Sequence, residues 1–239
     1  MTGIDALAHD REGWWRCEGI YTVRPSPVPM ARIGHLLLIP DSHRKAKGNA
    51  GTAVPKDACL QMLSAASRAS LLEMRKAVAT AARYPLGPDL LPGSTAKVDL
   101  LPAYLRYQGN MYRRIPPPSW EGRNKGVEIL ILSALYGPIH SQEPVRPYPF
   151  SMGESLPGLG TLHRWWRDHG LAAILAEVIT AMKPKKVTDL LSGVYRSAVE
   201  GYLPLVTGTK VEQVDFPGMG RASQAARGEI VAKILSGGP

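Results

Sequence analysis

A short apolar run near the middle of the chain most strongly constrains what this sequence can fold into. Residues 129–132 read Ile-Leu-Ile-Leu and contain no polar position that could face water, which is typical of a β-strand buried on both faces. The run ends at Ser133, and the chain breaks at Gly137-Pro138, directly after Tyr136. We therefore expect Ser133 and Tyr136 at the end of a buried strand, where open α/β sheets form ligand crevices. The alternative is an ordinary core strand with a hydrogen-bonded tyrosine.

Other segments alternate between the patterns of strands and helices. Short apolar runs predict further strands at residues 35–40, 187–191 and 211–216. Apolar residues spaced three and four apart predict helices at residues 56–83, 104–114, 162–182 and 223–235. Strands interleaved with helices favour an α/β (α+β) fold, with a central mixed β-sheet flanked by helices in a single domain.

Proline and aromatic residues predict where the domain begins and where one of its turns lies. Residues 1–34 contain Trp14-Trp15 and a proline-rich stretch at 24–29 that can continue neither a helix nor a central strand. We expect this extension to pack onto a domain formed by residues 35–239, while stacking of the two tryptophans on nucleic-acid bases is the alternative. Three prolines at 116–118 predict an exposed turn inside the domain.

Composition narrows the class of partner. The chain has 29 Lys and Arg against 20 Asp and Glu, a formal net charge of +9, which favours polyanions such as DNA or nucleotides. Its two cysteines lack a Cys-x-x-Cys spacing and its six histidines are scattered, so we expect no metal site and no cofactor. No signal peptide and no apolar stretch of about 20 residues is evident. We therefore expect a cytoplasmic protein with no membrane contact.

Polar side chains recur at the ends of the predicted strands and in one predicted helix. They are Ser42 and Lys45, Ser133 and Tyr136, Ser192 and Tyr195, and the helical pair Arg106 and Tyr107. Hydroxyl groups and cations without paired carboxylates suit an anion or a polar planar ring, since phenols stack on bases and Lys and Arg hold phosphate. Each residue taken alone is more often a structural cap, and the repetition favours a binding site.

Two further features suggest chemistry. The glycines Gly158 and Gly160 resemble the hairpin of a helix-hairpin-helix element, in which backbone N–H groups approach a DNA phosphate; a simple Pro-Gly turn before a helix is the alternative. His43, beside Lys45, is the best candidate for proton transfer because only imidazole titrates near neutrality without a shift. A solvated histidine in a turn is the alternative there.

Several of these segments together resemble one known family. The similar stretches are Pro40-Asp41-Ser42-His43-Arg44-Lys45, Leu101-Pro102-Ala103 with Arg106-Tyr107-x-Gly109-x-x-Tyr112, Ser133-Ala134-Leu135-Tyr136-Gly137, Pro147-Tyr148, Leu156 to Leu162 with Trp165 or Trp166, Leu191-Ser192-Gly193-x-Tyr195 and Ala226-Arg227-Gly228. Their order, from about His35 to Leu235, is that of the YaaA family of peroxide stress proteins. The sequence is therefore identified as a divergent member of that family with an N-terminal extension.

The resemblance implies a single-domain mixed α/β fold with a basic cleft, DNA binding, and a role in limiting iron-driven oxidative damage to DNA. It adds Tyr148 and Arg227 to the expected site. Three positions depart from the family pattern: His43 replaces a Glu, Pro149 an Arg, and Ala226 (with Ala225) a Lys. The loss of three charged groups suggests a site that is tuned to a different ligand.

Two functional hypotheses follow. The leading one is a YaaA-like nucleic-acid-binding protein associated with peroxide stress. The alternative is an enzyme that uses the same cleft on a nucleobase, a nucleotide or a similar small polar ring, with His43, Lys45 and Tyr136 as its catalytic residues. Under both we expect one cleft that gathers the binding residues Ser42, Lys45, Arg106, Tyr107, Ser133, Tyr136, Tyr148, Gly158, Gly160, Ser192, Tyr195 and Arg227. Neither hypothesis fixes the oligomeric state.

Overall fold

A five-stranded mixed sheet forms the centre of the protein. The computed structural model describes residues 33–50 and 58–237. The strand order is β4-β3-β1-β8-β9. The strands are β1 (His35–Pro40), β3 (Val127–Ser133), β4 (Gly137–His140), β8 (Lys186–Asp189) and β9 (Lys210–Gln213). All neighbours are parallel except β3 and β4. The predicted mixed α/β fold is confirmed.

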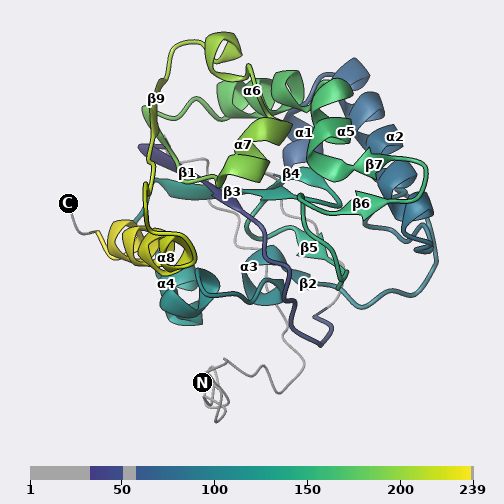
Figure 1. The fold of residues 1–239 in the computed structure, drawn as a ribbon, viewed down its shortest axis with the longest axis horizontal. Helices are drawn as coiled ribbons and strands as arrows, with labels where there is room; N and C mark the ends of the chain where they lie inside the picture. The colour runs from purple at the N-terminus through teal and green to yellow at the C-terminus, as the bar shows by residue number, and fades with distance from the viewer. Residues whose placement is uncertain (1–32, 51–57, 238–239) are drawn as a thin grey trace.

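Helices cover both faces of this sheet, which explains why its central strands are apolar throughout. Residues 36–39 of β1 and 129–132 of β3 are fully buried, as expected for parallel strands between two helical layers. In Figure 1, α1 (Cys59–Met62), α2 (Ala65–Ala81), α5 (Leu162–Asp168) and α6 (Leu171–Met182) lie on one side of the sheet. The helices α3 (Ala103–Arg106), α4 (Pro117–Glu121) and α8 (Ala222–Leu235) lie on the other.

Each of the long helices predicted at 56–83 and 162–182 is two helices in the structure. The first is broken between α1 and α2, where Ser64 takes an extended conformation and its hydroxyl accepts a hydrogen bond from Ser67 N, as an N-cap does. The second is broken between α5 and α6 at Gly170, which has a φ of 86°. A left-handed glycine before a new helix allows a sharp change of direction. The apolar periodicity predicts the helices on both sides of each interruption but gives no sign of the interruption itself.

Three other local predictions need correction. The helix expected at 104–114 is reduced to α3 and the 3₁₀ helix η1 (Tyr112–Arg114), with an irregular stretch between them. The prolines at 116–118 start the short helix α4, because Pro is favoured in the first turn of a helix. The chain does not leave the sheet at Gly137-Pro138: it turns back and forms β4 at the sheet edge, where proline is tolerated.

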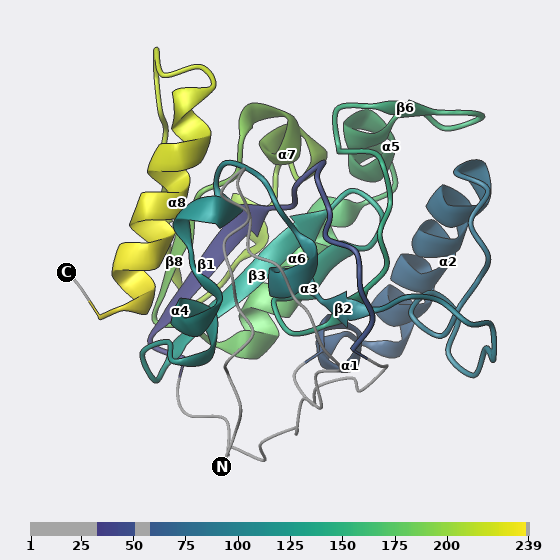
Figure 2. The ribbon, with the colours of Figure 1, turned by 90° about the horizontal axis from the view of Figure 1, so that it is seen from below.

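The remaining elements are short. Two-stranded sheets form from β2 (Leu101–Pro102) with β5 (Pro144–Val145) and from β6 (Ser155–Leu156) with β7 (Gly160–Thr161). The helix α7 (Gly193–Ala198) follows β8, and the 3₁₀ helix η2 (Leu203–Leu205) leads towards β9. In Figure 2 the β1 arrow points towards the side of the molecule on which α7 lies and α8 begins. The carboxyl ends of the parallel strands therefore meet beside these two helices.

The predicted packing of the N-terminal extension, with Trp14-Trp15, falls outside the described residues. Within residues 33–50 and 58–237, none of the helices combines the length and the apolar composition that crossing a membrane requires.

The contact between α8 and η1 can be tested with a single methyl group. A Cβ added at Gly228 would overlap the carbonyl oxygen of Met111 and lie 2.7 Å from Cβ of Arg114. We expect Gly228→Ala to lower the free energy of unfolding by about 1–3 kcal/mol, the usual cost of overpacking. The matched control is Gly193→Ala at the start of α7, where a Cβ would meet nothing within 4 Å. Urea unfolding that gives both variants equal stability would contradict the packing described here.

Candidate functional site

Asp41 directly follows β1, the central strand of the sheet, and is buried. The connection after β1 leads to β3 on one side, while the connection after β8 leads to β9 on the other. The carboxyl ends of β1 and β8 are therefore the point at which the chain switches direction, the usual position of a ligand crevice in open α/β sheets. Asp41 lies at this point.

The Asp41 carboxylate accepts three hydrogen bonds from different parts of the chain. Tyr148 and Tyr195 donate their phenolic O–H groups to its two oxygens. The backbone N–H of Ala134, just beyond β3, donates to Oδ2 at 2.9 Å. Hydrogen bonds to a buried carboxylate are among the strong ones in proteins. They hold the loop after β5, the start of α7 and the end of β3 around one side chain.

The direction of each hydrogen bond around Tyr148 can be deduced. Ser133 Oγ accepts the N–H groups of Leu135 and Tyr136 at 3.2 and 3.1 Å, so its own proton is free for Tyr148, 2.8 Å away. Because Tyr148 donates to Asp41, its oxygen is the acceptor for Ser133 and for Tyr107, whose hydroxyl lies 2.9 Å away. The hydroxyls thus form a chain of donors that ends at Asp41.

The phenols in this cluster remain protonated. Burial raises the pKa of Tyr107, Tyr148 and Tyr195, and the negative charge of Asp41 raises each pKa further. Both effects disfavour a second negative charge in the same buried region. These tyrosines therefore act as neutral hydrogen-bond donors and not as phenolates.

Lys45 is the cation that faces this cluster. Its backbone forms a β-bridge with Tyr107. Its ammonium group donates to the carbonyl oxygen of Phe150 at 2.9 Å and lies 3.5 Å from the ring centroid of Tyr148. Burial lowers the pKa of Lys45 to about 8, although the charges of Asp41 and Glu154 partly oppose the shift. Lys45 can therefore exchange a proton near neutral pH.

Ser42 and His43, which precede Lys45 in the turn, point away from the cluster. Ser42 Oγ donates to the carbonyl of Gln108 at 2.8 Å, and Gly109 lies so close to Ser42 that a Cβ would overlap its hydroxyl. His43 pairs with Glu154 at 3.1 Å, and its side chain is 60% exposed. Ser42 is therefore bound to the α3–η1 segment and His43 lies at the surface, so neither joins the hydrogen-bonded cluster.

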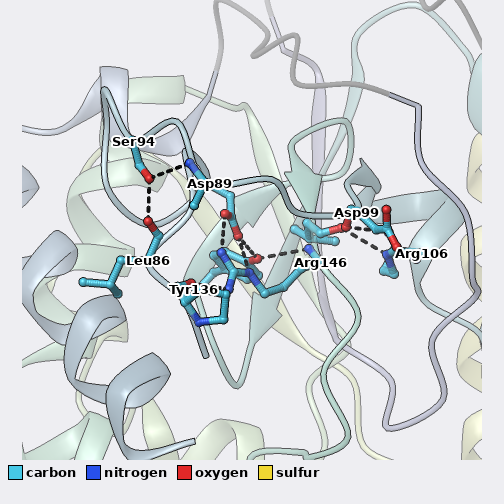
Figure 3. A network of polar contacts seen from close by, with 10 residues as sticks. Leu86, Asp89, Ser94, Asp99, Arg106, Tyr136 and Arg146 are labelled. Carbon is cyan, nitrogen blue, oxygen red and sulfur yellow. Dashed lines mark hydrogen bonds and ion pairs between the residues drawn. The ribbon is translucent and has the colours of Figure 1, made fainter. Parts of the chain in front are cut away.

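Arg106 is fully buried, and its guanidinium binds backbone carbonyl oxygens. Its partners are Val145 (3.0 Å), Gly48 (3.0 Å), Asp99 (3.1 Å) and Ala46. Figure 3 shows its bond to Asp99. Arg106 thus fastens the chain after Lys45 to β5, and its donors are used within the fold.

Tyr136 belongs to a neighbouring network, drawn in Figure 3. Its hydroxyl donates to Asp89 at 2.5 Å and accepts the N–H of Arg146 at 3.1 Å. The guanidinium of Arg146 binds both carboxylate oxygens of Asp89, at 2.5 and 2.8 Å. Burial and the Asp89 charge raise the pKa of Tyr136. Its ring packs edge-on against Tyr148, 6.2 Å between centroids, so Tyr136 supports the cluster from outside.

Of the remaining predicted residues, one joins the Asp41 cluster and the others lie outside it. Tyr195 joins the cluster from α7, and Ser192 is the half-buried residue before that helix. Arg227 donates to the carbonyl of Leu190 at 2.9 Å and lies 4.6 Å from the ring centroid of Phe216. Burial and the charge of Arg196 lower the pKa of Arg227. Its guanidinium holds α8 against the end of β8.

The hairpin at Gly158 and Gly160 is not part of a helix-hairpin-helix element. Both glycines have positive φ, 76° and 71°. Gly158 lies in the turn between the strands β6 and β7, Gly160 is the first residue of β7, and the helix α5 follows. The positive φ explains why glycine is needed, whereas the helix that would have to precede the hairpin is replaced by a strand. In Figure 2 the β6 hairpin lies at the edge of the molecule.

The structure adds two features that the sequence analysis missed. Asp41 was not among the expected site residues, although it directly follows the central strand β1 and is buried. A pocket of about 550 Å³ lies between η1 and the start of α8. It is lined by Asn110, Arg113, Arg114, Arg221, Ala222 and Ala225. Across residues 33–50 and 58–237, no three His, Cys, Asp or Glu side chains gather as metal ligands would.

Replacement of Asp41 tests whether its carboxylate organises the cluster. In Asp41→Asn one oxygen becomes an NH₂ group, which would face a phenolic O–H donor. We expect the free energy of unfolding to fall by about 3 kcal/mol, the cost of leaving buried donors unpaired. Asp168→Asn is the control, because this carboxylate is 59% exposed and pairs with its neighbour Arg167. Chemical unfolding that shows both variants within 0.5 kcal/mol of wild type would contradict the role of Asp41.

Comparisons with known proteins agree with the motifs. A family model described as "Peroxide stress protein YaaA" matches residues 54–237. The chain is also 31% identical over 223 residues to the UPF0246 protein SCO2297 of Streptomyces coelicolor, which covers 85% of this chain and 84% of that relative. Tyr107, Ser133, Tyr148 and Tyr195 lie inside the range of the family model, and Asp41 and Lys45 precede it. This chain belongs to the YaaA family of peroxide stress proteins.

Proposed function

We propose that this protein is an enzyme that acts on a small polar ring compound, of the nucleobase or nucleotide class, at the carboxyl end of β1. One observation carries the proposal: the Lys45 ammonium group lies against Tyr148, next to the Asp41 cluster, with its pKa lowered to about 8. Groups with strongly shifted pKa values at such a position are typical of active sites, because catalysis needs pKa values that differ from those in water.

Lys45 has the properties of a general base. With a pKa of about 8, roughly one tenth of the Lys45 side chains are neutral amines at pH 7, against fewer than one in a thousand for an unperturbed lysine. The neutral amine still has a hydrogen to donate to Phe150 O and a lone pair that can accept a proton from a bound ring. A base with a pKa near the working pH gives the most effective proton transfer. The protonated phenols beside it supply donors for ring oxygens or nitrogens.

The alternative function, nucleic-acid binding in peroxide-stress protection, keeps some support. The net charge of +9 favours polyanions, and three arginines line the surface pocket between η1 and α8. Against it, Arg106 and Arg227 direct their guanidinium groups to backbone carbonyls. The Gly158–Gly160 turn also lacks the helix-hairpin-helix context. Fewer of the residues expected to bind phosphate are therefore available for DNA.

The enzyme proposal predicts a pH profile that belongs to Lys45. Nucleobases, nucleosides and nucleotides would be screened for turnover by liquid chromatography with mass spectrometry. For any substrate found, kcat/KM should rise with pH and level off above about 8, where Lys45 is neutral. We expect Lys45→Met to lower kcat at least about 100-fold, the usual contribution of a general base, and to abolish this rise.

Two control variants make the test specific. Lys47→Met removes an exposed lysine from the same segment and should leave kcat within about twofold, because distant surface charges contribute little. His43→Ala should behave alike, since His43 lies at the surface against Glu154. If Lys45→Met keeps full turnover, the proposal is wrong. If no compound is turned over and duplex DNA binds with an affinity that falls steeply with salt, the nucleic-acid function replaces it.

A further inference from the structure

The pocket between η1 and α8 gathers positive charge from two distant parts of the chain. Arg113 and Arg114 come from η1, and Arg221 is the residue before the first turn of α8. The other lining residues, Asn110, Ala222 and Ala225, are uncharged. Three guanidinium groups line one hollow, and none of the six lining residues is a carboxylate, so the lining carries net positive charge.

Neighbouring groups do little to neutralise the charges of Arg114 and Arg221. Glu229 lies 3.9 Å from Arg114, but both side chains are more than half exposed, and exposed pairs of this kind are weak. Within the described part of the chain, no carboxylate forms an ion pair with the Arg221 side chain. The first turn of α8 contains no acidic residue that would offset these charges.

The walls of the pocket are fixed in place. Gly228 of α8 packs directly on Met111 and Arg114, and Arg113 N donates to the carbonyl of Gly109 at 2.9 Å. On the opposite wall, Ser223 Oγ donates to the carbonyl of Gly220 at 2.7 Å. A rigid wall lowers the entropy cost of ordering a bound anion. The short side chains of Ala222 and Ala225 leave the space open.

The pocket adjoins the segments that carry the Asp41 cluster. Tyr112 of η1 donates its hydroxyl to the carbonyl of Pro40 at 2.9 Å, next to Asp41. Gly109, just before Asn110, lies against Ser42. On the side of α8, Arg227 binds the carbonyl of Leu190 after β8. Both walls are thus anchored to the carboxyl ends of β1 and β8, the edge of the sheet at which Lys45 lies.

We propose that this pocket binds the phosphate of a phosphomonoester, so that the substrate class is a nucleoside monophosphate and not a free nucleobase. The ring of this substrate is inferred from the proposed function, on which this proposal rests. Its phosphate is inferred from the arginines of the pocket. A phosphomonoester carries nearly two negative charges at pH 7 and three terminal oxygens, which planar guanidinium groups can bind in pairs. A DNA phosphodiester carries one charge and lies along an extended strand, a poorer match for a single hollow lined by three arginines.

The binding test uses inorganic phosphate, the nucleoside 5′-monophosphates, the matching nucleosides and the methyl phosphodiesters of the same nucleotides, by calorimetry at constant ionic strength. We expect the monophosphates to bind at least tenfold more tightly than the nucleosides or the methyl diesters, and inorganic phosphate to compete with them. Equal affinity for nucleoside and nucleotide would overturn the proposal. So would tighter binding of a short DNA duplex than of the monophosphates.

Substitutions test whether phosphate binds in this pocket. Arg221→Gln should weaken binding of the monophosphates and of inorganic phosphate about tenfold, and Arg221→Lys should weaken it less. Arg164→Gln changes the net charge equally at an exposed position on α5 and should leave binding within twofold. Equal losses in Arg221→Gln and Arg164→Gln would mean general surface charge, which overturns the site.

Lys45→Met separates this proposal from the proposed enzyme. It should bind inorganic phosphate as wild type does, because Lys45 does not line the pocket. Failure of the enzyme proposal would appear as Lys45-independent turnover with phosphate binding intact. Failure of the phosphate site would appear as loss of discrimination between nucleotide and nucleoside, whether or not turnover depends on Lys45.

Discussion

The buried carboxylate of Asp41 is the interaction on which the rest of the site depends. A carboxylate in a protein interior is costly unless donors surround it. Here the donors come from the end of β3, the loop after β5 and the helix α7. Because these segments are far apart in the sequence, satisfying one side chain fixes the relative positions of three parts of the fold. The site and the stability of the domain are therefore coupled.

The same carboxylate sets the chemistry of its neighbours in two opposite ways. It raises the pKa of the surrounding phenols, which stay protonated. It also favours the ammonium form of Lys45, yet burial is the larger effect and lowers the pKa to about 8. The result is one group that titrates near neutrality among several that do not. Such a separation of pKa values is how an active site assigns the roles of base and donor.

Much of the fold was predictable, because it follows from local patterns. The apolar runs at 35–40 and 129–132 became the two central strands β1 and β3. Ser133, Tyr148, Tyr195 and Lys45 were singled out from strand ends and motifs, and the structure brings them together. The turn-back into β4 was missed, because a Gly-Pro pair looks the same whether the chain leaves a sheet or lines its edge.

The limits of sequence reasoning are clearest for charged residues. Arg106 and Arg227 looked like phosphate-binding groups, but a guanidinium that binds carbonyl oxygens has no distinct sequence signature. Tyr136 also looked like a cluster residue, and only the position of Asp89 shows where its hydroxyl goes. Asp41, in contrast, belongs to the cluster but was not expected there, since its burial and its three donors are visible only in the fold. Long-range partners decide the role of a polar side chain.

The most direct test of this account is the titration of Lys45 itself. Carbon-13 NMR of protein labelled at the lysine side chains would follow each Cε signal with pH, and Lys45→Arg would identify the signal of Lys45 by its disappearance. We expect a midpoint at about pH 8 for that signal. A midpoint at about pH 10 or above, where an unperturbed lysine titrates, would show that the Asp41 cluster does not hold Lys45 in a desolvated position and would contradict the account.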